Sequence, residues 1–232
     1  MKLFKNEHLK IASIALFFGA IWGILEATLG SVLHFEGIAK TFLSSSIIML
    51  PIAYFLMGGA YKTSGKIRAM LYAGLVAASI KMFAFFIPGI QPQYVINPAV
   101  SIVLESLMLV VFVKVIKPEN ILSVKSIAVV VLANIAFRMT FTLYQLATVV
   151  PFGAASFTIV DGVLAFNEAG FVKFNLTQFA LSSLYTIALG GIGYLVIKPF
   201  KNKNVNWLTN LVSNPITAVL LSAVAVTLTI VL

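Results

Sequence analysis

Long apolar segments separated by short polar ones run through the whole chain. Seven of them reach the length that a membrane-crossing helix needs, about 17 residues or more. The pattern predicts an all-α, polytopic transmembrane helix bundle that forms a single membrane domain over residues 1–232. We expect a six-helix core at about 11–197 and an extra C-terminal helix at about 211–232. The predicted spans are residues 11–34, 38–60, 69–87, 99–116, 126–150, 171–197 and 211–232.

Two of the polar connections are distinctive. Residues 89–98 contain two prolines and no charge, which is typical of an ordered loop. Residues 151–170 form a connection long enough for a lid over a site. We expect both connections on the outer side of the membrane.

Composition and charge agree with a membrane protein. The chain is 60% hydrophobic and 10% charged, with a mean hydropathy of +1.04. Its net charge of +9 is spread over short loops, unlike the basic face of a nucleic-acid-binding protein. Twelve of the sixteen Lys and Arg residues precede the first span or follow the second, fourth and sixth, which predicts a cytoplasmic N-terminus. The absence of cysteine excludes disulfides and thiolate chemistry.

The first span carries two rows of residues at a spacing of four. Ala15, Gly19, Gly23 and Ala27 form a small-residue ridge that lets another backbone approach closely. Such a ridge serves either as a docking face for a partner protein or as packing within the same bundle. The neighbouring polar row consists of Trp22, Glu26, Gly30 and His34.

Four ionisable residues lie well inside the predicted spans: Glu26, Lys81, Glu105 and Arg138. Counted from the helix ends at about 1.5 Å per residue, all four fall roughly 15–22 Å from the cytoplasmic boundary. Charges inside a membrane should face a polar interior rather than lipid. We therefore predict one polar chamber that binds a small polar or zwitterionic ligand. The other predicted ligand-binding residues are Trp22, His34, Asn134, Tyr144, Gln145, Gln178 and Tyr185.

The same residues have other interpretations. Glu26 with Arg138, or Glu105 with Lys81, could form ion pairs that only fix helix register. His34 and Glu36, together with Glu26, are a weak metal-ligand pattern, and we predict neither a metal nor a cofactor. Ser44, Ser45 and Ser46 lack a histidine base in their span, so we expect no enzymatic activity.

Taken together, these features resemble the substrate-binding S components of energy-coupling factor (ECF) transporters. The small-residue ridge matches in kind the small-xxx-small motif on helix one of that family, with glycine in place of alanine at two positions. The resemblance implies a six-helix bundle in a bacterial or archaeal cell membrane, with an outer pocket for a vitamin or related micronutrient. It also implies docking through helix one to a transmembrane T component that works with two cytoplasmic ATPases. The seventh helix departs from the family pattern.

Other functions remain open. In a proton-coupled secondary transporter of a small polar solute, Glu26 or Glu105 would take up the proton. A membrane enzyme acting on a lipid-linked substrate and a scaffold subunit without a ligand are further alternatives.

Overall fold

The computed structural model describes residues 7–30, 45–119, 123–152 and 206–232, together with residues 180–181, 183–185, 187–188 and 192. Within these residues every regular element is a helix, which confirms the predicted all-α class. Four helices are long and apolar enough to cross a membrane. They comprise Glu7–Leu29, Arg68–Phe86, Gln93–Ile116 and Val124–Tyr144.

The elements follow one another as helices joined by short turns or by segments outside the described residues. α1 (Glu7–Leu25) continues into a π-helical turn, η1 (Glu26–Gly30), and α5 continues into a 3-10 turn, η2. The remaining bounds are α4 (Ser45–Ser64), α5 (Arg68–Met82), η2 (Phe83–Phe86), α6 (Gln93–Ile116), α7 (Val124–Phe152), α9 (Asn206–Val212) and α10 (Pro215–Val231).

The helix limits differ from the prediction mainly on the N-terminal side. α1 begins at Glu7 rather than Ile11, and α6 begins at Gln93 rather than Ala99. The prediction of an outer loop over residues 89–98 is therefore wrong for Gln93–Pro98. A proline in this second turn removes only one backbone hydrogen bond, so the helix can run through Pro98. Most of the predicted sixth span and almost all of the predicted lid lie outside the described residues.

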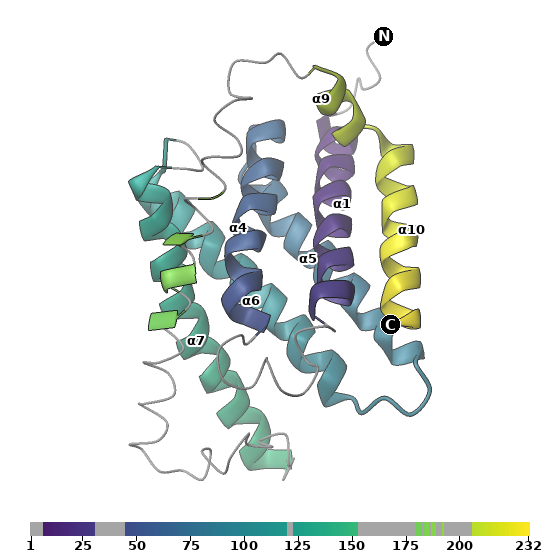
Figure 1. The fold of residues 1–232 in the computed structure, drawn as a ribbon, viewed down its shortest axis with the longest axis vertical. Coiled ribbons are helices and arrows are strands. Elements are labelled where there is room, and N and C mark those ends of the chain that lie inside the picture. Colours follow the sequence, from purple (N-terminus) through teal and green to yellow (C-terminus); the bar gives the residue numbers. More distant parts are fainter. Residues whose placement is uncertain are drawn as a thin grey trace.

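The helices pack around α1 and α5. α1 contacts α4, α5 and α10, α5 packs on α6, and α6 packs on α7. Figure 1 shows α1 between α4 and α10, with α7 on the far side of the bundle from α10. The largest buried cluster includes Trp22 of α1, Met57 of α4, Met70 of α5, Leu109 of α6 and Val129 of α7. These five helices therefore share one apolar core.

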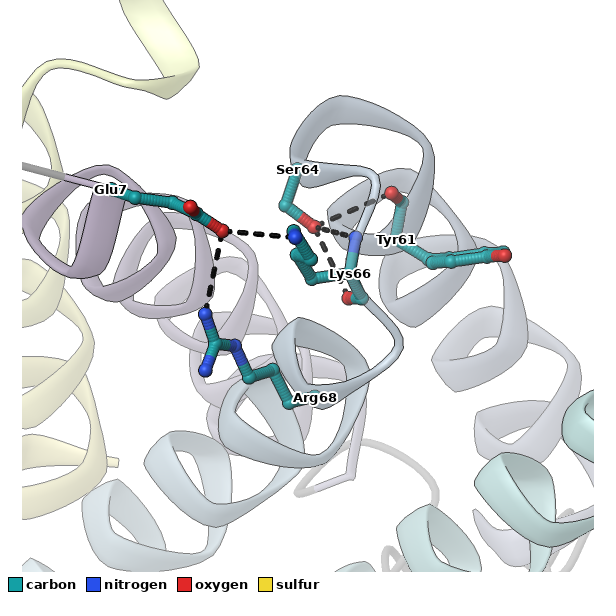
Figure 2. Close-up of polar contacts among 5 residues, drawn as sticks. All are labelled: Glu7, Tyr61, Ser64, Lys66 and Arg68. Carbon is teal, nitrogen blue, oxygen red and sulfur yellow. Dashed lines mark hydrogen bonds and ion pairs between the residues drawn. The ribbon is translucent and has the colours of Figure 1, made fainter.

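An exposed ion cluster joins the start of α1 to the α4–α5 turn. The Glu7 Oε1 atom lies 3.1 Å from Lys66 Nζ and 3.5 Å from Arg68 Nη2 (Figure 2). In the turn, the backbone N–H of Lys66 donates to Ser64 Oγ at 3.1 Å, and Gly65 takes a left-handed φ of 69°. α1 and α5 thus begin at the end of the bundle where α4 finishes.

The C-terminal helix is shorter than predicted. The Asn214 side chain accepts a hydrogen bond from the Ile216 backbone N–H at 3.0 Å, and Pro215 occupies the first turn. α10 therefore starts at Pro215, and Leu211 and Val212 belong to the preceding α9. Ala218 of α10 is buried with Ile14, and Ala225 is buried with Ala20, so α10 lies along α1.

Large apolar side chains remain exposed along the outer faces of the bundle. They include Tyr72, Leu75, Val111, Met139, Leu143, Ile216, Val219 and Leu220, from α5, α6, α7 and α10. Exposed apolar faces of this kind suit contact with lipid.

Candidate functional site

The small-residue ridge of α1 is packed against α5. A Cβ atom added at Gly19 would lie 2.6 Å from the Ala73 carbonyl oxygen, and one added at Gly23 would lie 2.9 Å from Ile80 Cγ2. Ala15 and Ala27 are only 2% and 3% exposed. Gly19 and Gly23 therefore pack within the chain, which agrees with the second of the two interpretations above. None of its four residues is exposed for docking in this structure.

Trp22 is held where α1, α5 and α6 meet. The α5–α6 crossing is close at Gly74, because a Cβ atom there would collide with the Ser106 side chain and would lie 3.6 Å from Trp22 Cζ3. Trp22 itself is 0% exposed. The glycine thus lets the two helices approach and leaves room for the indole ring beside them.

Two buried polar atoms of α1 and η1 have no hydrogen-bond partner within the described residues. They are Trp22 Nε1, a donor, and Glu26 Oε2, an acceptor. Glu26 is partly exposed as a whole, but this oxygen is buried. Residues 22 and 26 are one turn apart and lie on the same helix face. Glu26 also begins the π-helical turn, a rare geometry that often occurs at functional sites.

The four charged residues predicted inside the spans are neighbours. Glu26 interacts electrostatically with Lys81 of α5 and with Glu105 of α6, and Glu105 interacts in turn with Arg138 of α7. Each acid thus interacts with one base and with the other acid. The alternative in which ion pairs only fix helix register assumed other pairs, Glu26 with Arg138 and Glu105 with Lys81.

None of these charges forms a contact ion pair with another within the described part of the chain. The contact pairs found there are those of Glu7 with Lys66 and Arg68, and that of Glu119 with Lys125 at 3.1 Å, all of them exposed. Lys81 is partly exposed at the end of α5, whereas Glu105 is only 3% exposed. The two acids are therefore near the bases without being neutralised by direct contact.

On α6, Asn97, Ser101 and Glu105 follow one another at a spacing of four. The sequence analysis did not predict Asn97 and Ser101 as site residues. Ser101 Oγ donates to Glu105 Oε1 at 3.4 Å. Asn97 Oδ1 accepts a hydrogen bond from Tyr144 Oη of α7 at 3.1 Å. The spacing of Asn97, Ser101 and Glu105 was visible in the sequence, but Asn97 fell in the segment predicted to be a loop.

The predicted residues of α7 do not all lie together. Asn134 is 1% exposed, and Arg138 one turn later is partly buried. Tyr144 lies six residues beyond Arg138, about 9 Å along the helix. Its ring packs on Phe141 with the centroids 5.7 Å apart. Tyr144 therefore links α7 to α6 near Asn97.

Several predicted residues cannot be placed. His34, Gln178 and the side chain of Gln145 lie outside the described residues, as do Glu36 and Ser44. Tyr185 is described and partly buried, but it belongs to none of the helices above. Among the described residues no group of three potential metal ligands occurs.

Comparisons with protein-family models, with curated proteins and with solved structures found no match. The residues of the chain and their arrangement are therefore the basis of the proposals that follow.

Proposed function

We propose that this chain binds a small polar solute inside its helix bundle and serves as the substrate-capture subunit of an ECF-type importer. The four charged residues inside the bundle, Lys81, Glu26, Glu105 and Arg138, support solute binding. Charged groups within a membrane are costly and by default mark the path or site of a solute or an ion. Here they gather from four helices that otherwise pack through apolar side chains.

The incomplete hydrogen bonding of Glu26 favours binding over a purely structural role. Ion pairs that only fix helix register gain most when the two groups touch and complete each other's hydrogen bonds. Within the described residues, the Glu26 carboxylate forms no contact ion pair with Lys81, and its buried Oε2 atom accepts no hydrogen bond. A solute beside Glu26 would provide the missing hydrogen bond.

The transporter assignment rests on the resemblance described from the sequence. It places the N-terminus in the cytoplasm, the solute entry on the outer side, and a T component with two ATPases beside the bundle in a bacterial or archaeal cell membrane. The solute would be vitamin-like or another micronutrient, and this chain would hydrolyse nothing. Gly19 and Gly23 pack against α5, and Ala15 and Ala27 are buried, so we do not assign the docking face to this ridge.

The test of solute binding is mass spectrometry of small molecules that remain bound after purification in detergent. Lys81→Gln removes one of the four charges inside the bundle. Lys125→Gln is its matched control, because Lys125 pairs with Glu119 on the surface. We expect a retained molecule in the wild type and in Lys125→Gln, and its loss in Lys81→Gln at an unchanged melting temperature. A Lys81→Gln protein that melts earlier and still retains the molecule would indicate a structural role instead.

The importer assignment is tested separately by co-purification. Recovery of a second membrane protein together with two ATPase subunits would support it, and isolation of the chain alone from a native membrane would contradict it.

A proton-coupled secondary transporter is the second candidate. The observation that favours it is the electrostatic interaction of Glu26 with Glu105, because repulsion between two carboxylates favours uptake of a proton by one of them. Uptake of the solute into vesicles without any ATPase, driven by a proton gradient and abolished by a protonophore, would decide for this candidate.

A further inference from the structure

The unpartnered atoms of α1 and η1 define what could bind beside them. Trp22 Nε1 can only donate a hydrogen bond, and Glu26 Oε2 in its ionised form can only accept one. Leaving such a buried group without a partner costs about 1–3 kcal/mol, so each is expected to be satisfied in the working protein. A group that meets both must present an acceptor and a donor side by side.

The surrounding charges favour a group that is itself neutral. Glu26 interacts electrostatically with Lys81, and Glu105 with Arg138, so the formal charges of these four side chains cancel. An added cation or anion would unbalance this set in a site of low dielectric, where uncompensated charge is expensive.

The local backbone changes geometry between the two residues. The helix passes from α to π geometry at Glu26, so the carboxylate belongs to the first residue of the π-helical turn. Trp22, one turn earlier, is 0% exposed and lies beside the Gly74–Ser106 crossing. Three helices therefore fix the indole, whereas Glu26 as a whole is partly exposed although its Oε2 atom is buried.

We propose that Trp22 and Glu26 form a subsite for a neutral group with an acceptor beside a donor, such as an amide edge or a hydroxyl. The acceptor of this group takes the Trp22 N–H, and its donor meets Glu26 Oε2. The inference rests on the proposed solute-binding function and deepens it by naming the class of solute. That class carries a neutral amide-like or hydroxyl edge at this point, not an ammonium group or a carboxylate.

Three planar probes of the same size separate these classes: acetamide is neutral, acetate is an anion and acetamidinium is a cation. Trp22 can report their binding by fluorescence, because the chain has only two tryptophans and Trp207→Phe removes the other. In full-length Trp207→Phe protein in detergent, we expect acetamide to shift the emission saturably. Acetate and acetamidinium at the same ionic strength should bind at least about tenfold more weakly, because a buried uncompensated charge is disfavoured.

Two further variants tie the signal to the subsite. Glu26→Met keeps the length of the side chain but removes the acceptor, and Glu119→Met is the matched control on the exposed α6–α7 connection. We expect the acetamide affinity to fall roughly tenfold or more in Glu26→Met and to stay unchanged in Glu119→Met. If Glu26→Met does not fold, Trp22→Phe gives the second test. Acetamide should raise the melting temperature of the protein that keeps Trp22, and it should not raise that of Trp22→Phe.

The remaining outcomes overturn the inference. Binding of acetate or acetamidinium as tight as that of acetamide would contradict the solute class while leaving solute binding itself intact. A lack of saturable, Glu26-dependent signal from all three probes would mean that water alone fills the subsite. The proposed function is judged independently of both results by the molecules retained on purification.

Discussion

The small-residue ridge and the pair Trp22 and Glu26 of the polar row lie on adjacent faces of α1 and η1, and both are turned into the bundle. Along the ridge, Gly19 and Gly23 meet α5 so closely that a single added carbon would collide with Ala73 or Ile80. Along the polar row, Trp22 and Glu26 are also enclosed, but each keeps a buried polar atom without a hydrogen-bond partner among the described residues.

The difference separates packing from binding on one helix. The two glycines of the ridge are explained by another part of the same chain, because small residues and a close backbone complement each other. The polar row is explained only in part, because Glu26 has charged neighbours but Trp22 Nε1 and Glu26 Oε2 have no hydrogen-bond partner among the described residues. The helix face with Trp22 and Glu26 is therefore the one that needs a further hydrogen-bond partner.

The largest effect is expected from filling the ridge. In Gly19→Ala the new Cβ would lie 2.6 Å from the Ala73 carbonyl oxygen and from Val76 Cβ, so α1 and α5 must move apart. We expect a loss of about 2–3 kcal/mol in the free energy of unfolding. The measurement is denaturant unfolding of the protein in detergent micelles.

Gly59→Ala is the matched control for this change. The three atoms nearest to its Cβ would all belong to the ring of Phe18 and none to a backbone, so a shift of one side chain can relieve the contact. Alanine also has a higher helix propensity than glycine by about 1 kcal/mol, so this variant should be nearly neutral or slightly stabilising. If Gly19→Ala behaved like Gly59→Ala, the ridge would not be tightly packed on α5, and a docking role would regain support.

The comparison also shows which parts of the fold could be predicted from the sequence. Apolar length and charge distribution were sufficient to predict a helical membrane protein, because the bilayer imposes those features on any spanning helix. The start of α6 was missed because Pro98 and the polar residues around it are typical of loops, yet a proline early in a helix loses only one hydrogen bond.

Pairings between helices were harder to predict than the residues involved. The sequence identified Glu26, Lys81, Glu105 and Arg138, but it could not show that the two acids are neighbours, because helix order in space is not encoded by spacing along the chain. For the same reason the ridge was recognised as a close-packing surface without its partner helix.

A smaller effect is expected from Tyr144→Phe, which distinguishes a completed polar contact from the incomplete ones of the polar row. The change removes the hydrogen bond from Tyr144 Oη to Asn97 Oδ1 and should cost about 1 kcal/mol of stability. Because this hydroxyl already has a partner in the chain, the acetamide affinity of the Trp207→Phe background should not change. Loss of affinity without loss of stability would place Tyr144 in the ligand site, as the sequence predicted.

The smallest effect is expected from Glu7→Gln, which removes the ion cluster at the start of α1. Glu7 and Lys66 have side chains that are 57% and 50% exposed, so their attraction is weakened by water and screened by salt. We expect no measurable change in melting temperature at physiological ionic strength and at most a slight decrease at low salt. A clear decrease at both salt concentrations would mean that this cluster, and not the glycine contact between α1 and α5, holds the two helices together.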